Sequence, residues 1–150
     1  SHHGTEPWRF RVMTGDGRAA LAKAYGDIAA LGAPEAERDE ARAKAEAKAY
    51  RAPVVIAVSA LPSDAPKVVR NEELAAAHCA VQNLLLAAHA LGLAAIWRTG
   101  EPMYHPLMKQ ALGLAEAEEL VALVYLGKPE GPAPAGKRRP VAEKTVWLEG

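Results

Sequence analysis

An apolar-rich run between Asn71 and Leu91 constrains the fold of this chain more than any other feature. Leucine, valine and alanine occupy almost every side of a helix drawn through this segment. Helices that are apolar on every side are typical of a protein interior, so we predict a helix over Asn71–Leu91 in the middle of the core. Gly92 suits the left-handed conformation that ends many helices.

A short apolar strand is predicted directly after this helix, over Leu93–Trp97, and the polar tripeptide Arg98-Thr99-Gly100 follows it. A polar turn at the end of a buried strand presents backbone amides and side chains to a ligand, so we place the functional edge of the molecule here. A charge at the end of a buried strand is costly unless it is paired. Either an internal carboxylate or a ligand anion should therefore form an ion pair with Arg98, and physical reasoning favours the two equally.

The rest of the chain alternates between predicted strands and helices. Trp8–Thr14 has the period of two that is typical of a strand. Apolar residues fill both faces of Pro53–Ala60 and Glu118–Leu126, which indicates central strands. Helices are predicted over Arg18–Leu31 and His105–Leu112. Few strands separated by helices indicate an α/β or α+β fold, with one domain over residues 1–150.

Two regions are predicted to lie outside the core. Glu35–Tyr50 is rich in alanine and alternating charge, with pairs such as Glu40–Lys44 one helical turn apart. We expect a solvated helix that forms a mobile, lid-like arm. Glu130–Gly136 has the proline and glycine content of a linker, and we expect the tail Val141–Leu148 to dock through Trp147.

The composition argues against several classes of function. The 18 basic residues balance the 18 acidic ones, so no net field favours nucleic acid or an anionic membrane surface. No apolar stretch reaches the roughly 18 residues of a membrane-spanning helix. A single cysteine excludes an internal disulfide and fits a reducing compartment, so we expect a cytoplasmic protein. The chain opens on polar residues without an initiator Met, and we expect a native segment before Ser1.

Two pairs of neighbouring residues invite a chemical interpretation. His2 and His3 suggest a metal ligand, but no acidic or cysteine cluster stands at ligand spacing, and a purification-tag remnant also explains them. We predict no metal site. Cys79 beside His78 suggests a thiol and its base, yet neighbours on a helix do not share a face. A cysteine in an apolar helix is usually a buried hydrophobe, so we predict no catalytic thiol.

The chain contains, in order, the segments HHGTEPWRF, VQNLLLAAHALGL, IWRTG, YLGKP and KRRP. Together they resemble the FMN-dependent nitroreductase family, most closely its small bacterial NAD(P)H nitroreductase branch. That branch has a histidine five residues before a Pro-Trp pair, and an Ile-Trp-Arg-Ser/Thr-Gly run after the central helix. The family's N-terminal helix with its Arg-Arg-Ser motif has no counterpart here, and Glu6 stands where many members have Gln.

This resemblance implies a three-layer fold around a central mixed sheet, built as a homodimer with two FMN sites across the interface. It implies an oxidoreductase that passes electrons from NAD(P)H to a nitroaromatic, quinone or similar acceptor in two hydride half-reactions. The flavin supplies that chemistry, so no side chain is expected to act as a nucleophile. Cofactor-binding roles are implied for His2 at the flavin, for Trp97, Arg98 and Thr99 along its ring, and for Lys137 or Arg139 at its phosphate.

Two other hypotheses stay open. One is a family member that binds flavin in a storage or scaffold role without turning over an acceptor. The other is a helical interaction protein, for which the charged segment Glu35–Tyr50 is the one positive sign. A yellow colour of the purified protein would separate both flavin hypotheses from the last.

Overall fold

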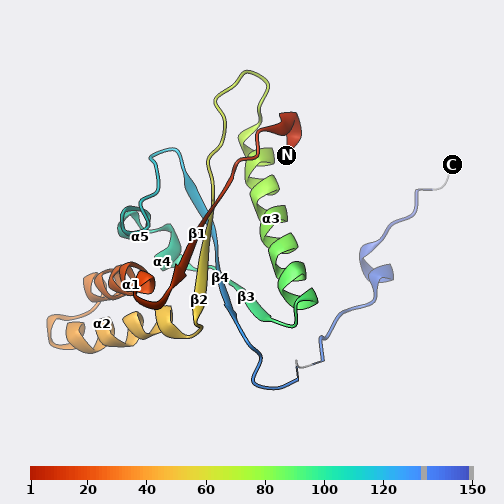
Figure 1. The fold of residues 1–150 in the computed structure, drawn as a ribbon. Helices are drawn as coiled ribbons and strands as arrows, with labels where there is room; N and C mark the ends of the chain where they lie inside the picture. Colours follow the sequence, from red (N-terminus) through yellow and green to blue (C-terminus); the bar gives the residue numbers. More distant parts are fainter. Residues whose placement is uncertain (133–134, 149–150) are drawn as a thin grey trace.

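A computed structural model of the chain describes residues 1–132 and 135–148. Four strands form one antiparallel sheet with helices on both faces, which confirms the expected α+β class and three layers (Figure 1). The expected mixed sheet is wrong in one respect, because all pairings between the described strands are antiparallel. In spatial order the strands are β1 (Trp8–Thr14), β2 (Val54–Ala60), β4 (Glu119–Gly127) and β3 (Ala94–Arg98).

The two strands predicted to be central are central. β2 lies between β1 and β4, and β4 lies between β2 and β3. Val55 and Val58 of β2 are fully buried, as are Ala122 and Val124 of β4. Side chains on both faces of these strands are therefore removed from water, which is why their sequences carry no polar face.

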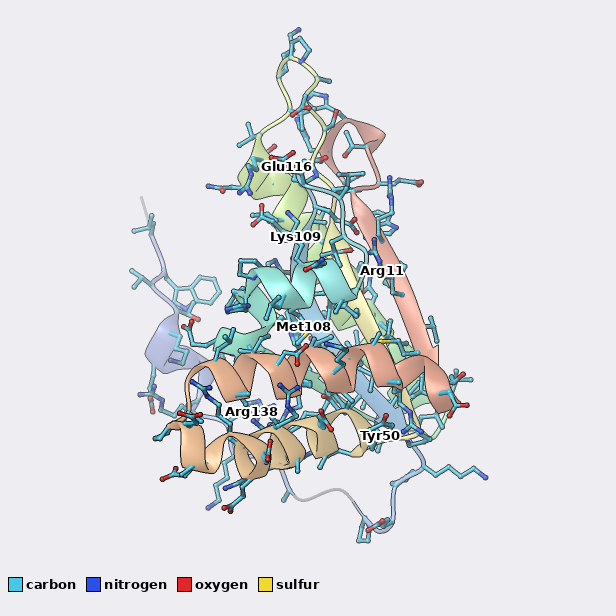
Figure 2. All side chains as sticks on the ribbon, turned by 90° about the vertical axis from the view of Figure 1, so that its left-hand side faces the viewer. Arg11, Tyr50, Met108, Lys109, Glu116 and Arg138 are labelled. Carbon is cyan, nitrogen blue, oxygen red and sulfur yellow. The ribbon has the colours of Figure 1, made fainter. Side chains whose placement is uncertain are left out.

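One face of the sheet is covered by α1 (Ala19–Leu31), α2 (Arg38–Glu46), α4 (Glu101–Tyr104) and α5 (Pro106–Ala111). Figure 2 looks onto this layer, with Met108 between α5 and α1. Met108, Leu21 and Leu123 are all fully buried in the cluster beneath. The predicted helix over His105–Leu112 begins one residue late, because His105 caps α5: its Nδ1 accepts a hydrogen bond from the Leu107 amide at 3.1 Å.

The charged segment Glu35–Tyr50 is part of this layer, so the lid-like arm is wrong. It consists of η3 (Glu35–Glu37), α2 and η4 (Ala47–Tyr50). Ala45 and Ala49 are buried, and Arg42 pairs with Asp27 of α1. At Gly26 the helices approach so closely that a Cβ would lie 2.6 Å from Glu46 Oε1.

Among the described helices, α3 (Arg70–Ala90) is the one that covers the opposite face (Figure 1). The predicted helix is confirmed, but its place in the middle of the core is wrong. Its buried residues, Glu73, Ala77, Val81 and Ala88, lie on the side that meets the sheet. Leu86 is 57% exposed on the other side, and Cys79, predicted to be buried, is also exposed.

The two edge strands are more exposed than the central ones. β1 has the predicted bounds, but Phe10 and Val12 of its apolar alternation are exposed, and Met13 is the buried residue. β3 is an edge strand rather than a buried one, and Ile96 is 52% exposed. Arg98 consequently ends an exposed strand, so burial alone does not force a carboxylate or a ligand anion to pair with it.

The C-terminal segment of residues 135–148 runs away from the body of the molecule (Figure 1). It contains one short helical turn, η5 (Val141–Lys144). Trp147 is 82% exposed, so its expected docking does not occur within the chain. The predicted linker Glu130–Gly136 includes residues 133–134, which lie outside the described residues. None of the described helices is long and apolar enough to cross a membrane.

Candidate functional site

The end of β3 sends consecutive side chains to opposite faces of the sheet. Trp97 packs toward α3, where its ring stacks on His78 with centroids 5.7 Å apart. The indole Nε1 of Trp97 is buried and has no hydrogen-bond partner among the described residues. Arg98 is exposed and lines a hollow on the other face together with Tyr125 and Arg51. The edge of the sheet thus carries an unsatisfied donor on one side and a cation on the other.

A tight turn follows, and Gly100 sets its shape. Gly100 has φ +127°, a conformation that side-chain-bearing residues rarely adopt. Its carbonyl accepts a hydrogen bond from the Met103 amide at 2.9 Å, which begins α4. Thr99 is exposed between this turn and β3. The glycine and α4 together hold Trp97–Gly100 at the sheet edge.

His2 lies at the far end of α3, in the short helical turn η1 (His2–Gly4). Thr5, directly after this turn, donates a hydrogen bond from Oγ1 to Glu73 Oε1 at 2.5 Å. The Ser63 amide donates to the other oxygen of Glu73 at 3.3 Å, and Glu73 is only 1% exposed. Glu73 therefore ties the His2 turn to the start of α3. Nothing in the sequence singled out this residue, because its partners lie 68 and 10 positions away.

Lys137 and Arg139 lie on the C-terminal segment, on either side of Arg138 (Figure 2). Both are exposed, and the segment stands away from the sheet (Figure 1). Of the six predicted site residues, Trp97, Arg98 and Thr99 follow one another at the end of β3, whereas His2, Lys137 and Arg139 lie elsewhere.

A buried ion pair elsewhere in the molecule has a structural role. Glu118 is 3% exposed and accepts hydrogen bonds from both Nη atoms of Arg11, at 2.5 and 2.9 Å, and from Ser59 Oγ at 2.5 Å. Burial by itself raises the pKa of Glu118, but the hydrogen bonds from Arg11, Ser59 and the Ala115 amide outweigh burial and lower it to about 2. This network fastens β1 to the residues that precede β4.

Tyr125 lines the same hollow as Arg98, and Tyr25 lies beside Tyr125. The hydroxyl oxygens of Tyr25 on α1 and Tyr125 on β4 are 3.4 Å apart. Burial raises the pKa of Tyr25 well above its usual range, and the hydrogen bond with Tyr125 acts in the same direction. The positive charges of Arg98 and Arg51 oppose this rise. Both guanidinium groups therefore act on the same phenol.

Metal and thiol chemistry find no support in the described residues. No group of three or more His, Cys, Asp or Glu side chains is placed there to hold a metal ion. His78 stacks on Trp97, while Cys79 is exposed at the next helical position. Adjacent residues on a helix point apart, so this pair has the wrong geometry for a nucleophile and its base.

Comparisons with known proteins give consistent matches. The profile described as "Nitroreductase family" matches residues 1–128. "Putative NAD(P)H nitroreductase YdjA" of Escherichia coli (strain K12) is 36% identical over 131 residues, 86% of this chain and 69% of that protein. The solved "Nitroreductase-like Family Protein from Bacillus cereus" has a TM-score of 0.84 and 27% identity, covering 100% of this chain and 78% of its own. A "putative nitroreductase in complex with fmn" from Desulfovibrio desulfuricans has a TM-score of 0.63 and 31% identity, covering 95% and 73%.

Proposed function

Because the chain belongs to the nitroreductase family, we propose that it is an FMN-dependent oxidoreductase consisting of one nitroreductase-like domain. Electrons pass from NAD(P)H to a nitroaromatic, quinone or similar acceptor in two hydride transfers. The observation that carries the proposal is the FMN complex of the Desulfovibrio desulfuricans relative, which is 31% identical over 95% of this chain. The name of the Escherichia coli relative supports NAD(P)H as the donor. A cytoplasmic location stays a prediction.

The residues at the end of β3 fit a flavin chemically. The buried Trp97 indole N–H lacks an acceptor in the described residues, and a polar ring system is rich in acceptors. β3 pairs on one side only among the described strands, so its other edge is open to a ligand. When bound, FMN would supply the hydride-transfer chemistry between donor and acceptor. The protein supplies position and charge.

The predicted site residues have distinct roles in this proposal. Trp97 and Thr99 lie along the ring, and Arg98 provides a positive charge that favours the anionic reduced flavin. Lys137 or Arg139 pairs with the phosphate, a charge-assisted contact that suits both side chains. His2 contacts the flavin.

We further propose a homodimer with a site at each end of its interface. Leu86 and Leu91 are more than half exposed, and so is Trp147 on the C-terminal segment. Apolar side chains exposed in this number favour contact with a second copy, which would remove them from water. A site assembled from two copies would also let His2 and the basic C-terminal residues meet Trp97–Thr99, which a single chain keeps apart.

Reconstitution tests the proposed function. The purified protein is incubated with FMN or with riboflavin, freed of unbound flavin, and examined by absorbance. We expect retained FMN, weaker retention of riboflavin because it lacks the phosphate, and NADPH or NADH oxidation when a nitroaromatic or a quinone is added. Protein that stays colourless with FMN contradicts the proposal. Yellow protein that reduces no acceptor would favour the storage or scaffold role.

A further inference from the structure

A hollow of about 490 Å³ opens beside the edge strand, on the face of the sheet that carries α1 and α2. Three stretches meet there: the residues before β2, the strand β3 and the residues that follow β4. Nothing local in the sequence links them, because the antiparallel pairing of the strands is what places them side by side.

Positive charge dominates the rim of this hollow. It is lined by Arg51, Arg98 and Lys128, with Glu130 as the one acidic lining residue. In the described part of the chain, none of the three cations forms an ion pair. Unpaired cations grouped around one concave surface attract anions. The charges of Arg98 and Arg51 also both act to lower the pKa of Tyr25, against the larger effect of burial, which agrees with their place on one face of the sheet.

The interior of the hollow is different in character. Its remaining lining is mostly apolar and includes Pro53, Ala94 and Ile96. A bare inorganic anion would leave this apolar surface in contact with water. A molecule with an apolar body and one anionic group would cover the surface and meet the cations together.

We propose that this hollow binds a small aromatic or otherwise apolar carboxylate, with Arg51, Lys128 and Arg98 around its charged group. Arg51 offers the planar fork of donors that matches a carboxylate, and Lys128 adds a point charge. The contacts of Arg51 and Lys128 with the carboxylate do not require bound flavin. Any effect on acceptor choice rests on the proposed function, because Arg98 is shared with the expected flavin edge.

The binding test compares benzoate with benzamide, which has the same ring but no charge. Each is titrated into ¹⁵N-labelled protein while amide shifts are followed by NMR. We expect benzoate to shift amides near Ala52, Ala94 and Lys128, and benzamide to bind at least about tenfold more weakly. Arg51→Gln and Lys128→Gln should each weaken benzoate binding about three- to tenfold. Both side chains are exposed, so the variants should fold.

The matched control is Arg38→Gln, which removes the same charge from α2 outside this hollow and should leave benzoate binding unchanged. Equal binding of benzoate and benzamide overturns the proposal, as does an equal loss in the control variant. Inorganic phosphate is the third probe. If phosphate shifts the same amides and competes fully while benzoate gains nothing from its ring, the site recognises charge alone and the proposal is wrong.

A kinetic test connects the hollow to acceptor choice. We expect a lower KM for 4-nitrobenzoate than for 4-nitrobenzamide, and a loss of that difference in Lys128→Gln with little change in kcat. Because benzoate binding is measured without turnover, an inactive protein that still binds benzoate contradicts the proposed function and leaves this inference standing. An active protein that does not bind benzoate supports the proposed function and contradicts the carboxylate site.

Discussion

The two faces of the sheet are covered in contrasting ways. On one face, four of the described helices cover a core in which Leu21, Met108 and Leu123 are fully buried. The ion pair of Arg11 and Glu118 lies at the edge of this core. On the other face, α3 is the one helix of the described chain that packs on the sheet, and Leu86 on its outer side is exposed.

This contrast distinguishes apolar residues that stabilise the fold from apolar residues that are available for association. The face under α1 and α2 has a core that is buried within the described chain, and substitutions there should change folding stability. The face under α3 exposes Leu86, while Leu91 beyond the helix is exposed as well. Substitutions there should change association before they change folding. Trp97 and Arg98, two of the residues expected at the flavin, lie on β3 at the edge of the sheet.

The largest expected effect is on the closed face. Leu21 is fully buried, so Leu21→Ala should lower the free energy of unfolding by about 2–5 kcal/mol, because it leaves a cavity. Leu86→Ala is the matched change on the open face, and in dilute protein it should alter that free energy by no more than about 0.5 kcal/mol. Urea denaturation followed by circular dichroism measures both. Equal losses would remove the distinction between the faces.

Breaking the Arg11–Glu118 ion pair should have the next largest effect on the free energy of unfolding. Arg11→Met leaves Glu118 buried without its cation and should cost about 3 kcal/mol near neutral pH. The folded-state pKa of Glu118 is depressed from 4.5 to about 2, so its stabilising effect is present above pH 4.5 and is lost as the pH falls toward 2.

The difference between the parent and Arg11→Met should therefore shrink over that pH range in urea titrations. Lys23→Met is the control, since Lys23 pairs with Asp27 at the surface and its side chain is 75% exposed. A similar loss of stability in the control, or a difference that does not depend on pH, would show that the Arg11–Glu118 pair does not stabilise this part of the fold.

A third variant tests the open face directly. Leu86→Arg should raise the dimer dissociation constant tenfold or more, roughly 1.4 kcal/mol, with folding intact. We choose Leu86 because Leu85 packs against the sheet. Leu31→Arg provides the control, as Leu31 is 68% exposed at the end of α1. Sedimentation velocity distinguishes the variants, and a parent protein that is monomeric at every concentration would refute the interface.

The smallest effect concerns the edge between the faces. Arg98→Ala should lower the midpoint potential of bound FMN by about 30 mV, since it removes a cation that favours the reduced anion. Lys137→Ala should weaken FMN binding and leave the potential nearly unchanged, because the phosphate charge does not depend on redox state. Spectroelectrochemistry measures both. An unchanged potential in Arg98→Ala would assign Arg98 to the hollow alone.

The sequence predicted elements better than their surroundings. Val54–Ala60 was recognisable because apolar residues on both faces have one common explanation, a central strand. The run before Arg98 is equally apolar, yet it forms an edge strand, because local composition does not determine the order of strands in the sheet. In Glu35–Tyr50, the charges concealed a stripe of alanines that packs onto α1. Family membership was predictable because its motifs are linear and ordered.

Contacts between residues far apart in the sequence could not be predicted for a different reason. Thr5 and Glu73 are 68 residues apart, and Arg11 and Glu118 are 107 apart. Arg51, Arg98 and Lys128 meet only after three strands have paired. None of these residues stands out in its own segment, because their contacts form only when the strands pair in the register of the sheet.

The open edge of β3 has a consequence for how the protein is produced. One row of its backbone N–H and C=O groups pairs with β4, and the other row meets no described strand. Such an edge accepts any extended segment, including those of unfinished neighbouring chains. Encounters of that kind increase with the square of chain concentration, whereas folding of a single chain does not. Slow synthesis at low temperature should therefore raise the yield of dispersed protein, and rapid synthesis should direct it into inclusion bodies.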